Sequence, residues 1–154
     1  MRKIYLILTI GGGFTGFALT FQAFFTAEQV NLVYYVIVAT FVALYGYGMF
    51  AGLRLADRPE DKKHLVIFYW LQVPWISSPV ISYRFTSGFN LSGAILDFKL
   101  TGFFRLGSDW QFSLLQAAPW GIGVNFFALV IAILLTKQLL LSPAVPGNST
   151  GLVQ

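Results

Sequence analysis

Long apolar runs separated by short polar stretches are the main pattern of this chain. The first two runs, residues 4–25 and 32–53, contain no charged residue. At about 1.5 Å per residue in a helix, each is long enough to cross a hydrocarbon core of about 30 Å. Two further apolar runs follow at residues 65–83 and 120–141, and two prolines in the earlier one predict a kink. The pattern therefore predicts four transmembrane helices within a single membrane domain, residues 1–154.

The segment between the last two runs, residues 82–118, changes from helical to alternating periodicity. Apolar and polar residues alternate over residues 96–101 and again over residues 110–114. Alternation of this kind beside glycine-containing turns predicts short antiparallel strands. We therefore expect an all-α integral membrane protein with a small extracytoplasmic β-hairpin or meander between helices 3 and 4. A hairpin turn at residues 107–109 would place four apolar side chains on one outer contact face: Phe104, Leu106, Trp110 and Phe112.

Basic residues are concentrated on one side of the four predicted helices. Seven Lys and Arg residues lie at the N-terminus, in the connector at residues 54–64 and near the end of the fourth run, whereas three lie on the other side. Because cytoplasmic flanks of membrane helices carry an excess of Lys and Arg, this bias predicts cytoplasmic N- and C-termini. Residues 142–154 would then form a cytoplasmic tail, and residues 82–118 would lie outside the cytoplasm. The compact plan and the lack of cysteine suit a bacterial inner membrane.

Composition agrees with a lipid environment and excludes several kinds of chemistry. The 154 residues are 56% hydrophobic and only 10% charged, which is too few charges to solvate the surface of a soluble domain. The absence of cysteine excludes disulfides, thiolate nucleophiles and cysteine metal sites. The single histidine, His64, has no second histidine with which to hold a metal. We therefore expect no catalytic residue, no metal and no cofactor, and no nucleic-acid partner despite the net charge of +4.

Glycines at helical spacing mark candidate packing positions in the first two runs. Gly12 and Gly16 are one helical turn apart, and so are Gly48 and Gly52. Small residues allow membrane helices to approach one another closely. These four glycines are therefore predicted to pack helices together, either within one chain or at a seam between copies.

Polar side chains inside the third and fourth runs are candidate intramembrane contacts. They are Gln72, Ser77, Ser78 and Asn125. Such residues either form hydrogen bonds between helices or line a polar path for a neutral compound. No Asp, Glu, Lys, Arg or His lies in the middle of any predicted helix, which argues against proton-coupled transport.

These patterns predict where the protein resides more closely than what it does. The leading hypothesis is a noncatalytic polytopic membrane protein that acts as an accessory subunit or binding partner in a membrane complex. Its partners would be the lipid bilayer and either another membrane protein or a second copy of itself. One alternative is an oligomeric channel or carrier for a small neutral or amphipathic compound. Another alternative is a membrane enzyme with an unrecognised site.

Overall fold

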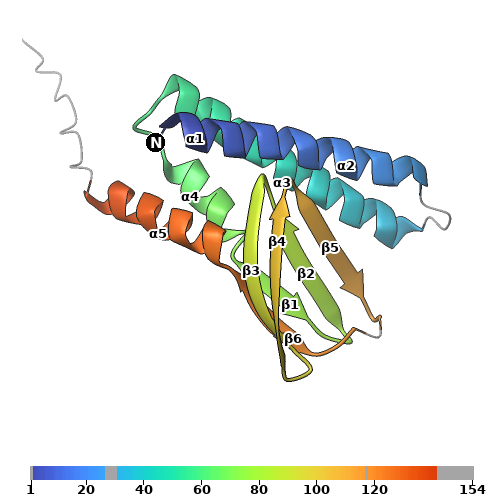
Figure 1. Ribbon diagram of the computed structural model, residues 1–154. Helices are drawn as coiled ribbons and strands as arrows, with labels where there is room; N and C mark the ends of the chain where they lie inside the picture. Colours follow the sequence, from blue (N-terminus) through green and yellow to red (C-terminus); the bar gives the residue numbers. More distant parts are fainter. Residues whose placement is uncertain (1, 27–30, 117, 142–154) are drawn as a thin grey trace, which may run out of the picture.

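The computed structural model describes residues 2–26, 31–116 and 118–141 of the chain. Its elements form a helical layer and a curled antiparallel sheet that lies against one side of that layer (Figure 1). A helical hairpin comes first along the chain, and a short helix follows it. Six strands come next, and a final helix closes the described part of the chain.

The helical hairpin forms from the first two apolar runs. Its first arm is a continuous helix made of α1 (Arg2–Leu6), the π-helical turn η1 (Ile7–Gly11) and α2 (Gly12–Thr26). Its second arm is α3 (Leu32–Asp57). Both arms are long and apolar enough to cross a membrane, by length and composition. Only 33% of the most apolar stretch of each arm is buried, so both arms turn much apolar surface outward.

The prediction of four transmembrane helices is wrong for the third and fourth helices. The helix α4 (Lys63–Trp70) has only 8 residues, and α5 (Phe126–Leu141) has 16. At about 1.5 Å per residue, neither reaches the roughly 30 Å of a hydrocarbon core. The chain leaves the helical conformation before Pro74, because a proline disfavours helical geometry in the residue before it and supplies no amide donor. The protein is therefore not an all-α four-helix membrane protein, because the rest of these two runs forms strands.

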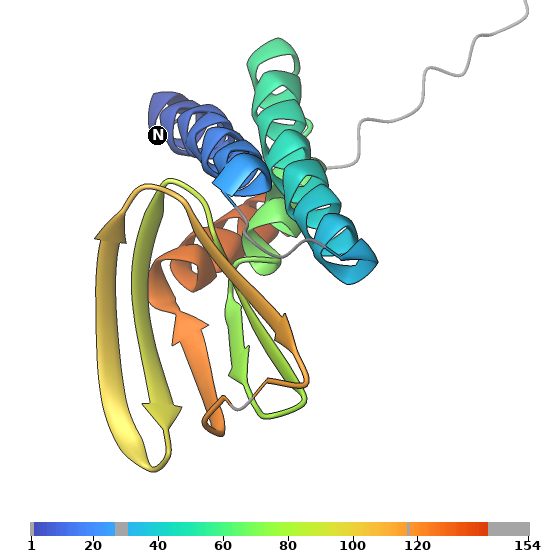
Figure 2. The same cartoon turned by 90° about the vertical axis from the view of Figure 1, so that its right-hand side faces the viewer.

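The curled sheet has the strand order β4-β3-β6-β1-β2-β5, and all pairs are antiparallel. Consecutive strands β4 and β5 thus lie at opposite edges, although only residues 107 and 108 join them. Three Cα–Cα steps span at most about 11 Å, so the sheet must curl until its edges approach at this turn (Figure 2). The strands are β1 (Pro74–Ser77), β2 (Ile81–Thr86), β3 (Phe89–Leu96), β4 (Lys99–Leu106), β5 (Asp109–Leu114) and β6 (Gly121–Asn125).

The predicted hairpin around residues 107–109 is also wrong, because the strands on either side of that turn do not pair with each other. Strand β4 pairs with β3, and β5 pairs with β2. The two-residue hairpin turn lies instead at Asp97 and Phe98, whose φ angles are 46° and 63°. Positive φ at both positions is the requirement of a type I′ turn, which usually selects Asn-Gly or Asp-Gly. Because Phe98 stands where this turn usually has glycine, the sequence does not predict the turn.

Two apolar clusters hold the layers together. The first joins the hairpin to α4 and α5, and its members include the fully buried Leu65 and Leu135. The second is aromatic and joins α3 to the sheet. Phe41 of α3 stacks on Trp110 of β5 with ring centroids 4.5 Å apart, and both Phe41 and Phe85 of β2 are buried. The sheet is therefore packed against α3 through β2 and β5.

The sheet also reaches the middle of the first arm. The Ser108 hydroxyl, in the turn between β4 and β5, donates a hydrogen bond to the carbonyl of Gly12. A Cβ atom at Gly12 would lie 2.5 Å from the amide nitrogen of Gly88, so a side chain there would push the sheet away. Gly12 lies about midway along this arm. The sheet is thus beside the hairpin and does not extend from its end.

Candidate interaction surface

The two faces of the sheet differ in chemistry. The rings of Trp75 in β1 and Phe103 in β4 are 4.8 Å apart, although β6 and β3 lie between their strands. Side chains separated by two strands meet only on the concave side of a curled sheet. Residues that alternate with them point to the convex side. This outer face is formed by Pro74, Ile76, Ile81, Tyr83, Phe85, Phe89, Leu91, Gly93, Ile95, Leu100, Gly102, Phe104, Leu106, Trp110, Phe112, Leu114, Ile122 and Val124.

One half of the outer face, on β2 and β5, is covered by α3. Trp110 and Phe112 are half-buried and pack against Phe41. Tyr83 lies in the same group of aromatic residues, and its hydroxyl donates to the carbonyl of Leu71 at 2.8 Å. Burial raises the pKa of Tyr83 to about 12, so its phenol stays protonated and can donate. Two residues of the predicted outer contact face, Trp110 and Phe112, thus pack against the chain's own helix.

The other half of the outer face, on β4, β3, β6 and β1, is open. Leu100 is 84% exposed, Phe104 67% and Ile122 68%. A hollow of about 710 Å³ lies over this half, where Gly93 faces Gly102 across β3 and β4. Contiguous exposed apolar side chains of this kind mark a contact with lipid or with another protein. The remaining two residues of the predicted contact face, Phe104 and Leu106, lie in this open half.

Strand β4 is an unpaired edge next to the open half. Among the described strands, only β3 pairs with it. Its Lys99 is exposed, and so is Arg105, whose side chain is 57% exposed. An unpaired strand presents a row of backbone donors and acceptors to which another strand can add. Because Lys99 and Arg105 both point to the concave side, an added strand would meet two cations there.

Arg84 is the charged centre of the concave face. Its Nη2 lies 2.7 Å from Oδ2 of Asp109, and the other carboxylate oxygen lies 3.2 Å from Nη1 of Arg105. The Arg84 guanidinium also lies 5.1 Å from the Trp75 ring centroid and 5.7 Å from that of Phe103. One carboxylate thus serves two cations, and two aromatic rings enclose the first of them. These contacts link β2 to both edge strands of the sheet, β5 and β4.

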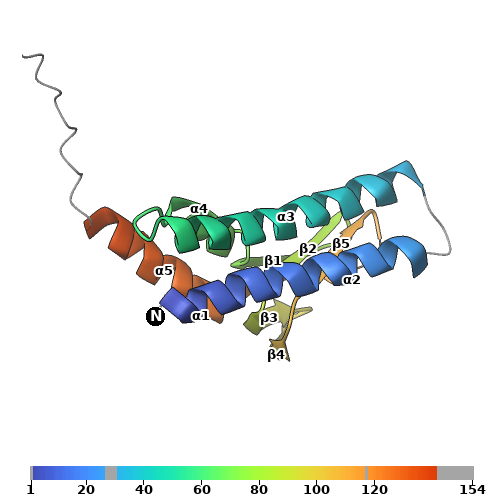
Figure 3. The same ribbon diagram turned by 90° about the horizontal axis from the view of Figure 1, so that it is seen from above.

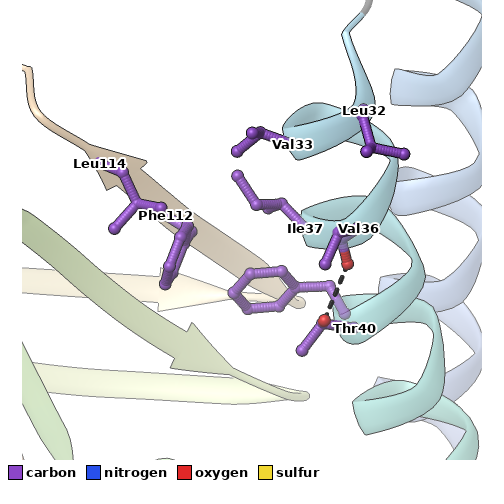
Figure 4. A pocket seen from close by; sticks show the side chains of 8 residues that line it. Leu32, Val33, Val36, Ile37, Thr40, Phe112 and Leu114 are labelled. Carbon is purple, nitrogen blue, oxygen red and sulfur yellow. Dashed lines mark hydrogen bonds between the residues drawn. The ribbon is translucent and has the colours of Figure 1, made fainter.

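A narrow crevice of about 280 Å³ separates the first half of α3 from β5 (Figure 4). Val33 and Ile37 project from α3 toward Phe112 and Leu114 of β5, and the described residues of the lining are apolar apart from Thr40. The Thr40 hydroxyl donates to a carbonyl of its own helix at 2.8 Å. The crevice therefore suits an apolar chain better than a polar ligand.

The four predicted polar contacts do not share one lining, because each bonds a different part of the backbone. Asn125, for example, caps α5, and its Nδ2 atom is buried without a hydrogen-bond partner. The bonds join Gln72 Oε1 to the Ser87 amide at 2.8 Å, Ser77 Oγ to the Pro119 carbonyl at 2.7 Å, Ser78 Oγ to the Ile81 amide at 3.0 Å, and Asn125 Oδ1 to the Ala128 amide at 3.2 Å.

Each of the four predicted packing glycines lies close to another segment of the same chain. A Cβ atom at Gly12 would meet the loop between β2 and β3. At the other three positions it would lie within 2.5 Å of a side chain: Gly16 faces Tyr45, Gly48 faces Phe68, and Gly52 faces Ile10. The last two of these contacts join α3 to α4 and to η1.

Chemistry-bearing side chains are sparse in this structure. His64 Nδ1 lies 3.2 Å from the Tyr47 hydroxyl, and the two rings lie near Phe50. Within residues 2–26, 31–116 and 118–141, no group of three or more His, Asp or Glu residues is arranged to hold a metal ion. The features that stand out are instead surfaces, namely the open outer face and the β4 edge.

Comparison with known proteins assigns the chain to no family. No protein-family model matches it, and neither a curated protein nor a solved structure does. Function must therefore be inferred from the geometry of the surfaces described above.

Proposed function

We propose that this is a noncatalytic membrane protein that acts as an accessory subunit in a membrane complex and that its curled sheet is the docking element. The supporting observation is the open apolar outer face beside the unpaired edge strand β4. The partner is a second membrane protein that covers this face and adds a strand to β4.

In this proposal the helical hairpin crosses the bilayer twice, and its N-terminus is cytoplasmic. Seven cations lie at the end of the hairpin where the first arm starts and α3 finishes, and they include Lys137 of α5. Lys62, before α4, donates to Gln138 of α5 at 2.9 Å, so the end of α5 belongs to the same side. The excess of Lys and Arg favours the cytoplasm for this side. The tail at residues 142–154 lies outside the described residues.

Neither lipid nor water alone is a favourable surrounding for both the open apolar outer face and the unpaired β4 edge. Because Ser108 bonds Gly12 in the middle of the first arm, a hairpin in the bilayer brings the sheet to hydrocarbon depth. An unpaired strand edge at that depth leaves backbone groups without partners, at a cost of several kcal/mol each. In water the edge is solvated, but Leu100, Phe104 and Ile122 are then exposed to it. A covering protein removes both costs.

Charge on the β4 edge favours a different protein over a second copy. Antiparallel pairing of two β4 strands centred on Gly102 would set Lys99 of each copy opposite Arg105 of the other. Parallel pairing in register would set each cation beside its own counterpart. Like charges directly opposite each other destabilise a strand pair. We therefore propose that the added strand carries Asp or Glu on the concave side.

Purification of the tagged full-length chain from its native membrane in mild detergent tests this proposal. We expect one stoichiometric partner with the wild type, and loss of that partner with Lys99→Glu. Lys3→Glu is the matched control, because it makes the same charge change at the exposed start of the first arm and not in the sheet. This variant should retain the partner. A wild-type chain that purifies alone, or an assembly of this chain only, would contradict the proposal.

A carrier for an amphipathic compound is the second candidate, and the crevice between α3 and β5 favours it. Its volume of about 280 Å³ and apolar lining suit an acyl chain. We expect mass spectrometry of the purified protein to detect a bound amphipathic compound that is lost in Ile37→Trp, which fills the crevice. Val130→Trp on the exposed side of α5 is the control and should retain the compound.

A further inference from the structure

A small pocket lies where four helices come together, at the end of the hairpin where the first arm begins and α3 ends. The start of α1, the end of α3, and the helices α4 and α5 gather at this end (Figure 3). The pocket has a volume of about 230 Å³. Its walls include two cations, Arg2 and Lys62, and three buried apolar side chains, Tyr5, Leu55 and Leu135.

The charge of this basic pocket is not balanced by its own lining. Among the residues that the structure describes, no carboxylate lines it, and Arg2 and Lys62 are bonded to neutral groups, the Ala56 carbonyl and the Gln138 side chain. Of the three carboxylates at this end, Asp61 lies 3.6 Å from Arg54, which is outside the pocket. Seven cations and three carboxylates at this end account for the whole net charge of +4. The pocket therefore attracts an anion.

The polarity of the pocket changes with depth. Arg2 is exposed and Lys62 half-buried, whereas Tyr5, Leu55 and Leu135 are buried at 8% exposure or less. An anion bound by the cations would thus have apolar walls beneath it. A free inorganic anion gains nothing from such walls, but the glycerol and acyl chains of a lipid do. Basic pockets between helices on the cytoplasmic side of membrane proteins are suited to anionic lipid headgroups.

We infer that this basic pocket binds the phosphodiester of an anionic phospholipid. Arg2 and Lys62 hold the phosphate oxygens through charge-assisted hydrogen bonds, and the acyl chains run along the apolar helices. The inference rests on the membrane placement proposed above, but not on the protein partner of the sheet. Lipid bound here would also join the start of the first arm to α4 and stabilise the fold.

The test measures thermal unfolding of the detergent-purified full chain against added phosphatidylglycerol, phosphatidylcholine or inorganic phosphate. We expect phosphatidylglycerol to raise the unfolding temperature and the other two to have no effect. A Lys or Arg near an anionic lipid strengthens binding about fivefold. In Arg2→Gln/Lys62→Gln, the phosphatidylglycerol concentration for half the rise should therefore increase roughly 30-fold.

Lys3→Gln/Lys63→Gln is the matched control, because it removes the same charge from the neighbouring exposed positions outside the pocket. It should keep the wild-type response. Gln138→Arg adds a third cation to the lining and should lower the phosphatidylglycerol concentration for half the rise about fivefold. This variant tests the lipid site even if the double variant does not fold.

The lipid site is overturned if the control loses the response as fully as the pocket variant, or if phosphatidylcholine works equally well. It is also overturned if inorganic phosphate reproduces the rise, because the ligand would then be a soluble anion. Failure of partner co-purification with an intact phosphatidylglycerol response would remove the docking proposal and leave the lipid site.

Discussion

The two halves of the sheet's outer face have the same apolar pattern but different surroundings. On β2 and β5, the aromatic side chains pack on α3 and are buried or half-buried. On β4, equivalent residues such as Phe104 and Leu106 are exposed. Alternation therefore determines which side chains share a face, but not what covers that face. The covered half should contribute to stability of the isolated chain, and the open half to association.

The largest expected effect is in the covered half, from Phe41→Ala. Phe41 is 2% exposed and stacks on Trp110, so its loss leaves a cavity between α3 and the sheet. Removal of a buried aromatic ring lowers the free energy of unfolding by about 3–5 kcal/mol. Denaturant unfolding of the purified protein in detergent measures this. A loss below about 1 kcal/mol would mean that α3 and the sheet are not packed as described.

A smaller loss is expected when the charged centre of the concave face is altered by Asp109→Asn. The change removes the carboxylate that serves Arg84 and Arg105 and leaves two cations without it. We expect a loss of roughly 2–3 kcal/mol in the same unfolding measurement, because the half-buried Arg84 loses its partner. Asp97→Asn makes the same charge change at an exposed turn and should be nearly neutral. Equal effects of the two would show that the ion pairs contribute little.

Close packing at α3 is tested by Gly48→Ala against Gly46→Ala. A Cβ atom at Gly48 would lie 2.4 Å from the ring of Phe68, whereas one at Gly46 meets nothing within 4 Å. Overpacking should cost about 1–3 kcal/mol in the first variant. The second should be stabilised by about 0.5–1 kcal/mol, since alanine favours a helix over glycine. Stabilisation of both variants would mean that α4 does not pack on Gly48.

The smallest effect on the isolated chain is expected in the open half, from Phe104→Ser. Its side chain is already 67% exposed, so unfolding free energy should change by less than about 0.5 kcal/mol. Recovery of the proposed partner should nevertheless fall, because the outer face loses an aromatic contact. A large loss of stability with unchanged partner recovery would reverse the comparison between the two halves.

The sequence contained more of the sheet than the apolar runs suggested. Residues 81–86 alternate between an apolar set that includes Tyr83 and Phe85 and a polar set that includes Arg84. Because residues 81–83 also end the third apolar run, the prediction assigns them to a helix. Short apolar segments are ambiguous between helix and strand when only composition and periodicity are considered. The charged edge residues Lys99 and Arg105 were missed for a related reason, because an edge exists only once strand order is known.

By itself, the sequence determined the two apolar arms and which side chains share a face within residues 110–114, since both depend on local periodicity. The alternation over residues 96–101 is interrupted by the turn at Asp97 and Phe98, which places Leu96 and Leu100 on opposite faces of the sheet. Only the tertiary structure decided that β4 and β5 lie at opposite edges and that Arg84 meets Phe103. Strand pairing is chosen by backbone hydrogen bonds between segments distant in the chain, and local periodicity carries no information about the partner. What covers a face depends in turn on that pairing. For this reason α3 covers β5, whereas β4 is left open.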